Sequence, residues 1–339
     1  MEAMKGKKGF FFTFLSIIAM SLFIVIFTPQ SEVSYKKNSE AIKTRILVID
    51  NYVLELESNY LEVALRAASY KTILSLVYYV NQTRAPISNL DKSFYEVVRT
   101  GNISNPLPVP IDSITGKKIM KSNYLMNFTD KIAETSEDAL NVNTSIRINN
   151  ASITQVSPWE LKSILDVNIT VQSNEGEWKR NNVIVTTSFS IEEVPDPYYL
   201  LNLNGGYSNK VKRSSMEFDE WNLTYVREHL RNGTYVHWKD SQAPSFLMRL
   251  SGDMSNSTCC GIESLVNPNR LTVPDVQESY VDYQFWTSTV DDCKEIYNIT
   301  NPNSPATEKG LWDEFPFFKL DLNHTVLYNI TSEYAVRNC

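Results

Sequence analysis

Glycine and histidine are both scarce in this chain of 339 residues, which has 11 glycines and three histidines. Loops that hold phosphate groups need closely spaced glycines, and neither a P-loop nor a dinucleotide-binding fingerprint occurs. His229, His237 and His324 do not have the spacing of a zinc protease, and we interpret them as structural side chains. The sequence therefore predicts a protein that is not an enzyme, with no cofactor and no metal site.

Basic runs are also missing from the body of the chain. The net charge is −7 at pH 7, and three lysines near the start are among the few clustered cations. A protein that binds nucleic acid needs a basic patch to neutralise phosphates. The charge pattern therefore argues against nucleic acid as a partner.

Cysteine is absent until late in the chain, where four residues occur: Cys259, Cys260, Cys293 and Cys339. An even number of cysteines in one region of an exported chain predicts two disulfides. The spacing leaves all three possible pairings open. Zinc is the weaker interpretation, because no C-x-x-C pair or histidine cluster accompanies these cysteines.

Charge is absent from Phe10 to Phe27, a run of 18 residues. As a helix this run would be about 27 Å long, enough to cross the hydrocarbon core of a bilayer. The lysines before it predict a cytoplasmic N-terminus, so the rest of the chain would be extracellular. We therefore expect a single-pass protein of the cell membrane, with a transmembrane helix over 10–28 in contact with the lipid bilayer.

The basic residue Lys8, the small residue Gly9 and the apolar Phe10 form a seam that resembles the class III signal peptide of archaeal type IV pilin-like surface proteins. The resemblance implies a cytoplasmic leader over 1–9, which a prepilin peptidase removes between Gly9 and Phe10. It also implies other pilin-like subunits as partners in a filament. The glutamate that many bacterial pilins carry at the fifth mature position is Phe14 here, and the chain is long for a major pilin. A minor subunit fits better.

A stalk helix is predicted over 29–80, because residues 30–85 contain neither glycine nor proline and apolar residues recur at alternating steps of three and four. The stripe is Ile46, Ile49, Val53, Leu56, Tyr60, Val63, Ala67, Tyr70, Leu74 and Val77. Further apolar residues beside it widen the face, which favours packing against this chain's own body over a coiled coil with another chain.

The body divides by pattern into two parts. Residues 81–203 contain alternating apolar runs, Leu165–Val171 and Val183–Ile191, joined by a turn at SNEGEW, which predict an antiparallel hairpin. Residues 204–339 hold all four cysteines and many aromatic side chains, which predict a compact C-terminal module. The expected fold class is α+β, with a long N-terminal transmembrane and stalk helix packed on an antiparallel β-sheet and a disulfide-containing C-terminal module.

Twelve asparagines begin an N-x-[ST] triplet, about twice the number that the composition gives by chance. They are Asn81, Asn102, Asn127, Asn143, Asn150, Asn168, Asn222, Asn232, Asn256, Asn298, Asn323 and Asn329. The excess predicts an N-glycosylated surface.

Three functions remain open on the sequence. The first is a glycosylated, pilin-like surface protein that joins a filament as a minor subunit. The second is an uncleaved, anchored ectodomain that binds a partner or a surface. The third is an anchored hydrolase, which ranks last because no catalytic motif is present.

Overall fold

The computed structural model describes residues 31–103, 119–203, 209–216, 220–239, 242–287, 295–299, 311–330 and 335–337. The chain divides into two compact units, one of residues 1–54 with 174–176 and one of residues 55–173 with 177–339. The fold is α+β, as predicted, with a three-stranded antiparallel sheet in the second unit.

In the first unit, the described residues are those of helix α2 (Ser31–Glu55), up to Leu54, and a short turn at 174–176. The two segments are joined by an ion pair in which Arg45 Nε lies 2.8 Å from Glu175 Oε2. Both side chains are partly shielded from solvent. This ion pair holds the turn at 174–176 against helix α2, so the two belong to the same compact unit.

The helical path continues beyond α2 through a π-helical turn, η1 (Leu56–Tyr60), into α3 (Leu61–Thr83). The N–H of Leu61 donates to the carbonyl oxygen of Leu56, five residues earlier, whereas an α-helix bonds to the residue four earlier. The predicted stripe places Tyr60 and Val63 on the buried face, but they are 52% and 62% exposed. The extra residue in the π-turn rotates the chain, so that burial resumes at Leu61. The stripe is therefore wrong at these two positions.

Three long strands form the sheet in the order β1-β2-β3: β1 (Asn143–Ser157), β2 (Glu160–Ser173) and β3 (Gly176–Ser190). Every second residue of β2 from Leu161 to Val171 is buried, as alternation predicts for a sheet with one face in the core. Strand β1 pairs with β2 along its whole length, with register shifts between Ile148 and Asn150 and between Gln155 and Ser157.

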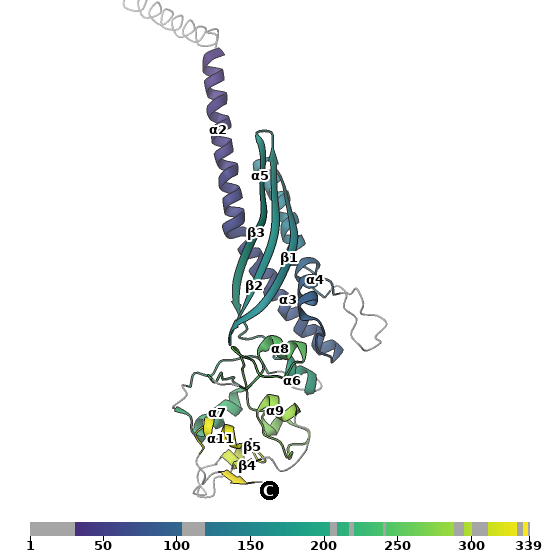
Figure 1. The fold of residues 1–339 in the computed structure, drawn as a ribbon, viewed down its shortest axis with the longest axis vertical. Coiled ribbons are helices and arrows are strands. Elements are labelled where there is room, and N and C mark those ends of the chain that lie inside the picture. The colour runs from purple at the N-terminus through teal and green to yellow at the C-terminus, as the bar shows by residue number, and fades with distance from the viewer. Residues whose placement is uncertain are drawn as a thin grey trace, which may run out of the picture. The chain divides into compact units, whose positions relative to one another are not determined.

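Helices α3, α4 (Leu90–Thr100) and α5 (Leu125–Leu140) pack against this sheet (Figure 1). Inside the interface the Ser69 hydroxyl of α3 donates to the Ser163 hydroxyl of β2 at 2.9 Å, and both side chains are buried. The aromatic rings of Tyr70 and Phe189 meet edge to face, with 6.0 Å between their centroids. Packing of the apolar helix face on the sheet thus forms one part of the core.

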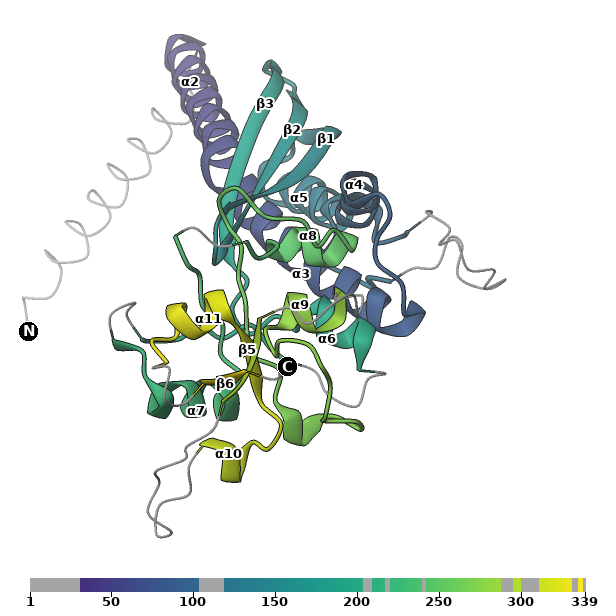
Figure 2. The same cartoon turned by 60° about the horizontal axis from the view of Figure 1, so that its bottom comes forward.

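The C-terminal part of the second unit is built from short elements (Figure 2). They surround a second group of buried aromatic side chains. The helices of this part are α6 (Pro197–Asn202), α7 (Leu223–Asn232), α8 (Phe246–Ser251), η3 (Pro268–Arg270), α9 (Asp282–Thr287), α10 (Leu311–Glu314) and α11 (Leu322–Leu327). Strands β4 (Ile296–Ile299), β5 (Lys319–Asp321) and β6 (Ala335–Arg337) form a small antiparallel sheet in the order β5-β4-β6.

One part of the predicted fold class needs correction. Among the described residues, which begin at residue 31, no helix is long and apolar enough to cross a membrane. Charged side chains such as Lys43, Asp50 and Glu62 recur along the helices from α2 to α3 and lower their mean hydropathy. This finding contradicts the expected transmembrane helix and the expected single-pass location in the cell membrane. The predicted helix over 10–28 and the seam Lys8–Phe10 lie outside the described residues.

Candidate functional site

Arg249 of α8 is fully buried and forms the first of two polar networks in the C-terminal part. Its Nη1 atom lies 2.8 Å from Oδ2 of Asp196 and 2.8 Å from Oδ2 of Asp282, and both carboxylates are also fully buried. Asp196 precedes α6 and caps it by accepting the N–H of Tyr198, while Asp282 is the first residue of α9. One guanidinium group thus ties three short helices together.

Burial and charge act in opposite directions in this network. Burial raises the pKa of the Asp282 carboxyl, and the neighbouring Arg249 only partly offsets this effect. Burial would lower the pKa of Arg249, but Asp282 and Asp196 hold it well above its ordinary value. Further donors satisfy the acids: the hydroxyl of Tyr235 donates to Asp196 Oδ2 at 2.9 Å, and that of Ser264 donates to Asp282 Oδ2 at 2.8 Å.

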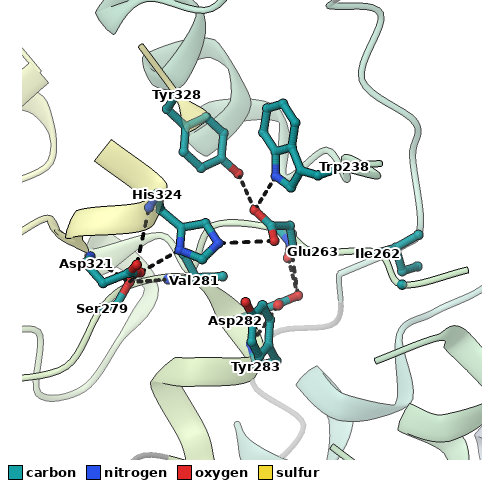
Figure 3. A network of polar contacts seen from close by, with 12 residues as sticks. Trp238, Ile262, Glu263, Ser279, Val281, Asp282, Tyr283, Asp321, His324 and Tyr328 are labelled. Atoms are coloured by element: carbon teal, nitrogen blue, oxygen red, sulfur yellow. Dashed lines mark hydrogen bonds and ion pairs between the residues drawn. The ribbon is translucent and has the colours of Figure 1, made fainter. Parts of the chain in front are cut away.

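Glu263 is the centre of the second network and is 1% exposed (Figure 3). The indole N–H of Trp238 donates to its Oε1 atom at 2.7 Å, and the hydroxyl of Tyr328 donates to the same atom at 3.2 Å. Its other oxygen, Oε2, lies 3.2 Å from Nε2 of His324. The carboxylate therefore receives three donors in a site that excludes water.

His324, in α11, lies between two carboxylates. Its Nδ1 atom is 2.6 Å from Oδ2 of Asp321, opposite the contact between its Nε2 atom and Glu263. Burial by itself would lower the pKa of His324, but Glu263 and Asp321 together raise it to about 10. The imidazole is thus positively charged at neutral pH and donates both N–H groups. The hydroxyl of Ser279 also donates to Asp321, at 2.9 Å.

The two networks meet on the segment Ile262–Ser264. The carbonyl oxygen of Ile262 accepts a hydrogen bond from Arg249, and the N–H of Ser264 donates to Asp282 Oδ2 at 3.1 Å. Glu263, between them, belongs to the second network and pairs its backbone with Val236 in both directions. The segment Ile262–Ser264 therefore links the two networks to the segment 235–239.

Residues 235–239 line a groove with a volume of about 990 Å³. Tyr235 and Trp238, which line the groove, are the same side chains that donate to Asp196 and Glu263. Trp221 also lines it and contacts Tyr328 edge to face, with 4.9 Å between the ring centroids. The buried networks thus hold the aromatic side chains that form the floor of the groove.

The accessible side chains of the groove have a different character. Arg213 is exposed, and its guanidinium carbon lies 5.6 Å from the centroid of the half-buried Trp159 ring. Lys239 is also exposed, and Glu192 is the one acidic residue of the lining. The Nδ1–H of His237 donates to the carbonyl oxygen of Gly261 at 2.7 Å, which leaves Nε2 as an acceptor in the neutral ring.

The structure contains one of the two predicted disulfides. Cys259 and Cys260 are joined to each other, although they are adjacent in the sequence, and Cys260 is buried while Cys259 is exposed. The sequence left all three pairings open, and the structure has the one in which two adjacent cysteines are joined. Cys293 and Cys339 lie outside the described residues. The Cys259–Cys260 disulfide closes a loop that directly precedes Gly261, the partner of His237.

The twelve predicted glycosylation sites all lie among the described residues, and none of them is buried. By contrast, Asn209 and Asn267, which do not begin such a triplet, are 6% and 7% exposed. Asn222 uses its Oδ1 atom to cap α7. Asn168 forms hydrogen bonds with Asn149 across the sheet in both directions.

Sequence reasoning predicted structural histidines but missed the buried charges. His324 is held between two acids, and His229 is buried beside Trp221, where burial lowers its pKa to about 4. Arg249 and Glu263 were not singled out, although each is a lone charge in an apolar run, in SFLMRL and GIESLV. That pattern is the signal that points to a buried ion.

No family model, no curated protein and no solved structure matches the chain.

Proposed function

We propose that this protein is an N-glycosylated, non-enzymatic binding protein that holds its ligand in the groove of the C-terminal part. The observation that carries the proposal is the combination of an accessible, mixed lining and a rigid floor. Tyr235 and Trp238 of the floor are fixed by hydrogen bonds to buried acids. A pre-organised site loses little side-chain entropy when a ligand binds.

Binding rather than catalysis is favoured by where the reactive side chains lie. Acid–base catalysis needs groups that a substrate can contact. Glu263, Asp282 and His324 are at most 3% exposed, and each is occupied by partners of this chain. These groups stabilise the floor of the groove, whereas the groups of the lining that face solvent are a tryptophan, two cations, the carboxylate of Glu192 and hydroxyls.

Glycosylation is supported by the position of the twelve N-x-[ST] asparagines, each of which lies at least partly exposed in the described ranges. A glycan needs an accessible amide, and buried asparagines would have argued against modification. Mass mapping of peptides from the protein made in its native cells tests this part. Hexose-containing masses on Asn150, Asn232 and Asn256, which are exposed, are the expected result, and bare peptides at all twelve sites would refute it.

The binding role is tested with an array that presents neutral saccharides, acidic saccharides and peptides. Trp159→Ala removes an accessible aromatic side chain from the groove, and we expect it to abolish the signal of whichever class the wild type binds. Tyr78→Ala is the matched control, because Tyr78 is 59% exposed on α3 and does not line the groove. Equal loss in both variants, or no array signal with the wild type, would contradict the proposal.

A second candidate function is a filament subunit of the pilin-like type. It is supported by the packing of α3 on an antiparallel sheet and by the resemblance of the Lys8–Phe10 seam to a class III signal peptide. The mature N-terminus tests it. A chain that begins at Phe10 would support processing by a prepilin peptidase, and a chain that begins at Met1 would exclude it.

A further inference from the structure

We infer that the groove binds an acidic oligosaccharide, with one carboxylate group held by Arg213 and a second by Lys239. This inference rests on the proposed binding function and specifies the chemistry of the ligand. It follows from the charge, the aromatic contacts and the hydrogen-bonding atoms that line the groove.

The first observation is a local excess of positive charge in an acidic protein. The chain has a net charge of −7, yet the lining of the groove contains Arg213 and Lys239 against the single acid Glu192. No ion pair joins either cation to a carboxylate within the described residues. At physiological salt, charges beyond about 8 Å are screened, so the local pair and not the net charge determines which ion enters.

The second observation is the orientation of Arg213. Its guanidinium group lies over the ring of Trp159, with 5.6 Å from its central carbon to the ring centroid. Such a cation–π contact restrains the guanidinium group near the ring, and the group has five N–H donors that can meet a ligand. A carboxylate matches these donors in a two-point hydrogen-bonded contact. Lys239 adds a second, more mobile positive charge to the same groove.

The third observation concerns the remaining polar atoms, which suit hydroxyl groups. The neutral ring of His237 offers an acceptor at Nε2, because its Nδ1–H is donated to the carbonyl oxygen of Gly261. Ser214 and Ser215 add hydroxyls to the lining, and Met216 adds apolar surface on which the C–H face of a sugar ring can lie. A ligand with both carboxylate and hydroxyl groups on rings that have an apolar C–H face satisfies all of these atoms together.

The size of the groove indicates more than one sugar. Its volume of about 990 Å³ lies at the upper end of the about 300–1,000 Å³ that small-molecule sites have. A single monosaccharide would leave most of that space to water. Several linked uronic acid residues would place one carboxylate against Arg213 and a second against Lys239.

The experiment compares two probes that differ only in whether their carboxyl groups are ionised or methylated. Isothermal titration calorimetry of the full, glycosylated protein is carried out with tetragalacturonic acid and with the same tetramer as its methyl ester. We expect the acid to bind about tenfold or more tightly, since a charge-assisted hydrogen bond is lost in the ester. We also expect the affinity for the acid to fall as salt is raised.

Variants assign the effect to the groove. Arg213→Ala and Lys239→Ala should each weaken binding of the acid, and Arg213→Lys should weaken it as well because the two-point contact is lost. Glu192→Gln should tighten it, because the one acid of the lining is removed. Lys212→Ala is the matched control: Lys212 is an exposed cation next to Arg213 that does not line the groove.

Each adverse outcome is distinct. Equal affinity for acid and ester, or an equal loss with Lys212→Ala and Arg213→Ala, would overturn the inference. Tighter binding of tetraglutamate than of tetragalacturonic acid would replace the saccharide by an acidic peptide. If neither tetramer binds, the acidic oligosaccharide is excluded, while a signal of another class that Trp159→Ala abolishes would still support the binding function.

Discussion

The indole N–H of Trp238 donates to Oε1 of Glu263 at 2.7 Å, and this bond joins the floor of the groove to a carboxylate that is 1% exposed. The same carboxylate faces the imidazole of His324. A buried acid without such partners would cost several kcal/mol, roughly as much as half the stability of a small domain. The position of Trp238 is therefore coupled to the charge of a residue in α11.

Removal of the charge on Glu263 should destabilise the protein. Glu263→Gln keeps the size of the side chain and an acceptor for Trp238 but leaves Asp321 as the only acid beside His324. We expect the free energy of unfolding to fall by about 2–3 kcal/mol. Removing one partner of an isolated buried ion pair costs more, about 3–5 kcal/mol, because the other charge is then left without a partner. Urea denaturation at pH 7 measures it. Glu160→Gln, at an exposed strand end, is the control and should change stability by less than about 0.5 kcal/mol.

The stability of the protein should fall as the pH rises above neutrality. The pKa of His324 is about 10 in the folded state, raised against its burial by Glu263 and Asp321, and 6.5 is its ordinary value. Below pH 6.5 the ring is protonated in both states, and its stabilising contribution is complete. Above pH 6.5 only the unfolded chain loses the proton, so this contribution decreases by about 1.4 kcal/mol per pH unit until the folded state titrates as well.

Unfolding free energies at several values between pH 7 and pH 10 test this slope. His324→Gln should be less stable at pH 7 and should show a flatter profile over the same range. A profile for the variant that runs parallel to that of the wild type would mean that His324 is not the group responsible.

Arg249 should tolerate no substitution well. Arg249→Met would leave the buried acids Asp196 and Asp282 facing each other without a cation, and we expect a loss of about 3–5 kcal/mol. Arg249→Lys keeps the charge but cannot donate to both acids and to the Ile262 carbonyl oxygen in the same geometry, so a smaller loss is expected. Thermal unfolding followed by circular dichroism compares both with Arg147→Met, an exposed arginine of β1. If Arg249→Met melts like the control, the network does not stabilise the fold.

The π-turn should accept the deletion of one residue. Deletion of Asn59, which is exposed in η1, restores a spacing of four between Leu56 and Leu61, so both remain on the buried face of an unbroken α-helix. Deletion of the exposed Lys71 from α3 instead rotates every later residue by about 100° and exposes the core positions after it. We expect cooperative unfolding to persist in the first variant and to be lost in the second. Equal damage in both would show that η1 is required as a π-turn.

Several features of this protein were determined by the sequence alone, because they depend on neighbours along the chain. The alternation from Leu165 to Val171 defines a strand with one buried face, since successive side chains point to opposite sides of a sheet. The absence of glycine and proline over 30–85 allows a long helical path. The positions of the N-x-[ST] triplets indicate accessible asparagines, and none of the twelve is buried in the described residues.

Other features were decided only by the tertiary structure. The steps of three and four along the helix predicted a buried stripe through Tyr60 and Val63. Because the π-turn contains one extra residue, the buried face of the helix continues at Leu61 instead. The joining of Cys259 to Cys260 was one of three pairings that the sequence left open. Arg249 meets Asp196 and Asp282 across 53 and 33 positions of the chain. Which of these charges meet one another depends on packing between distant segments, which no local pattern encodes.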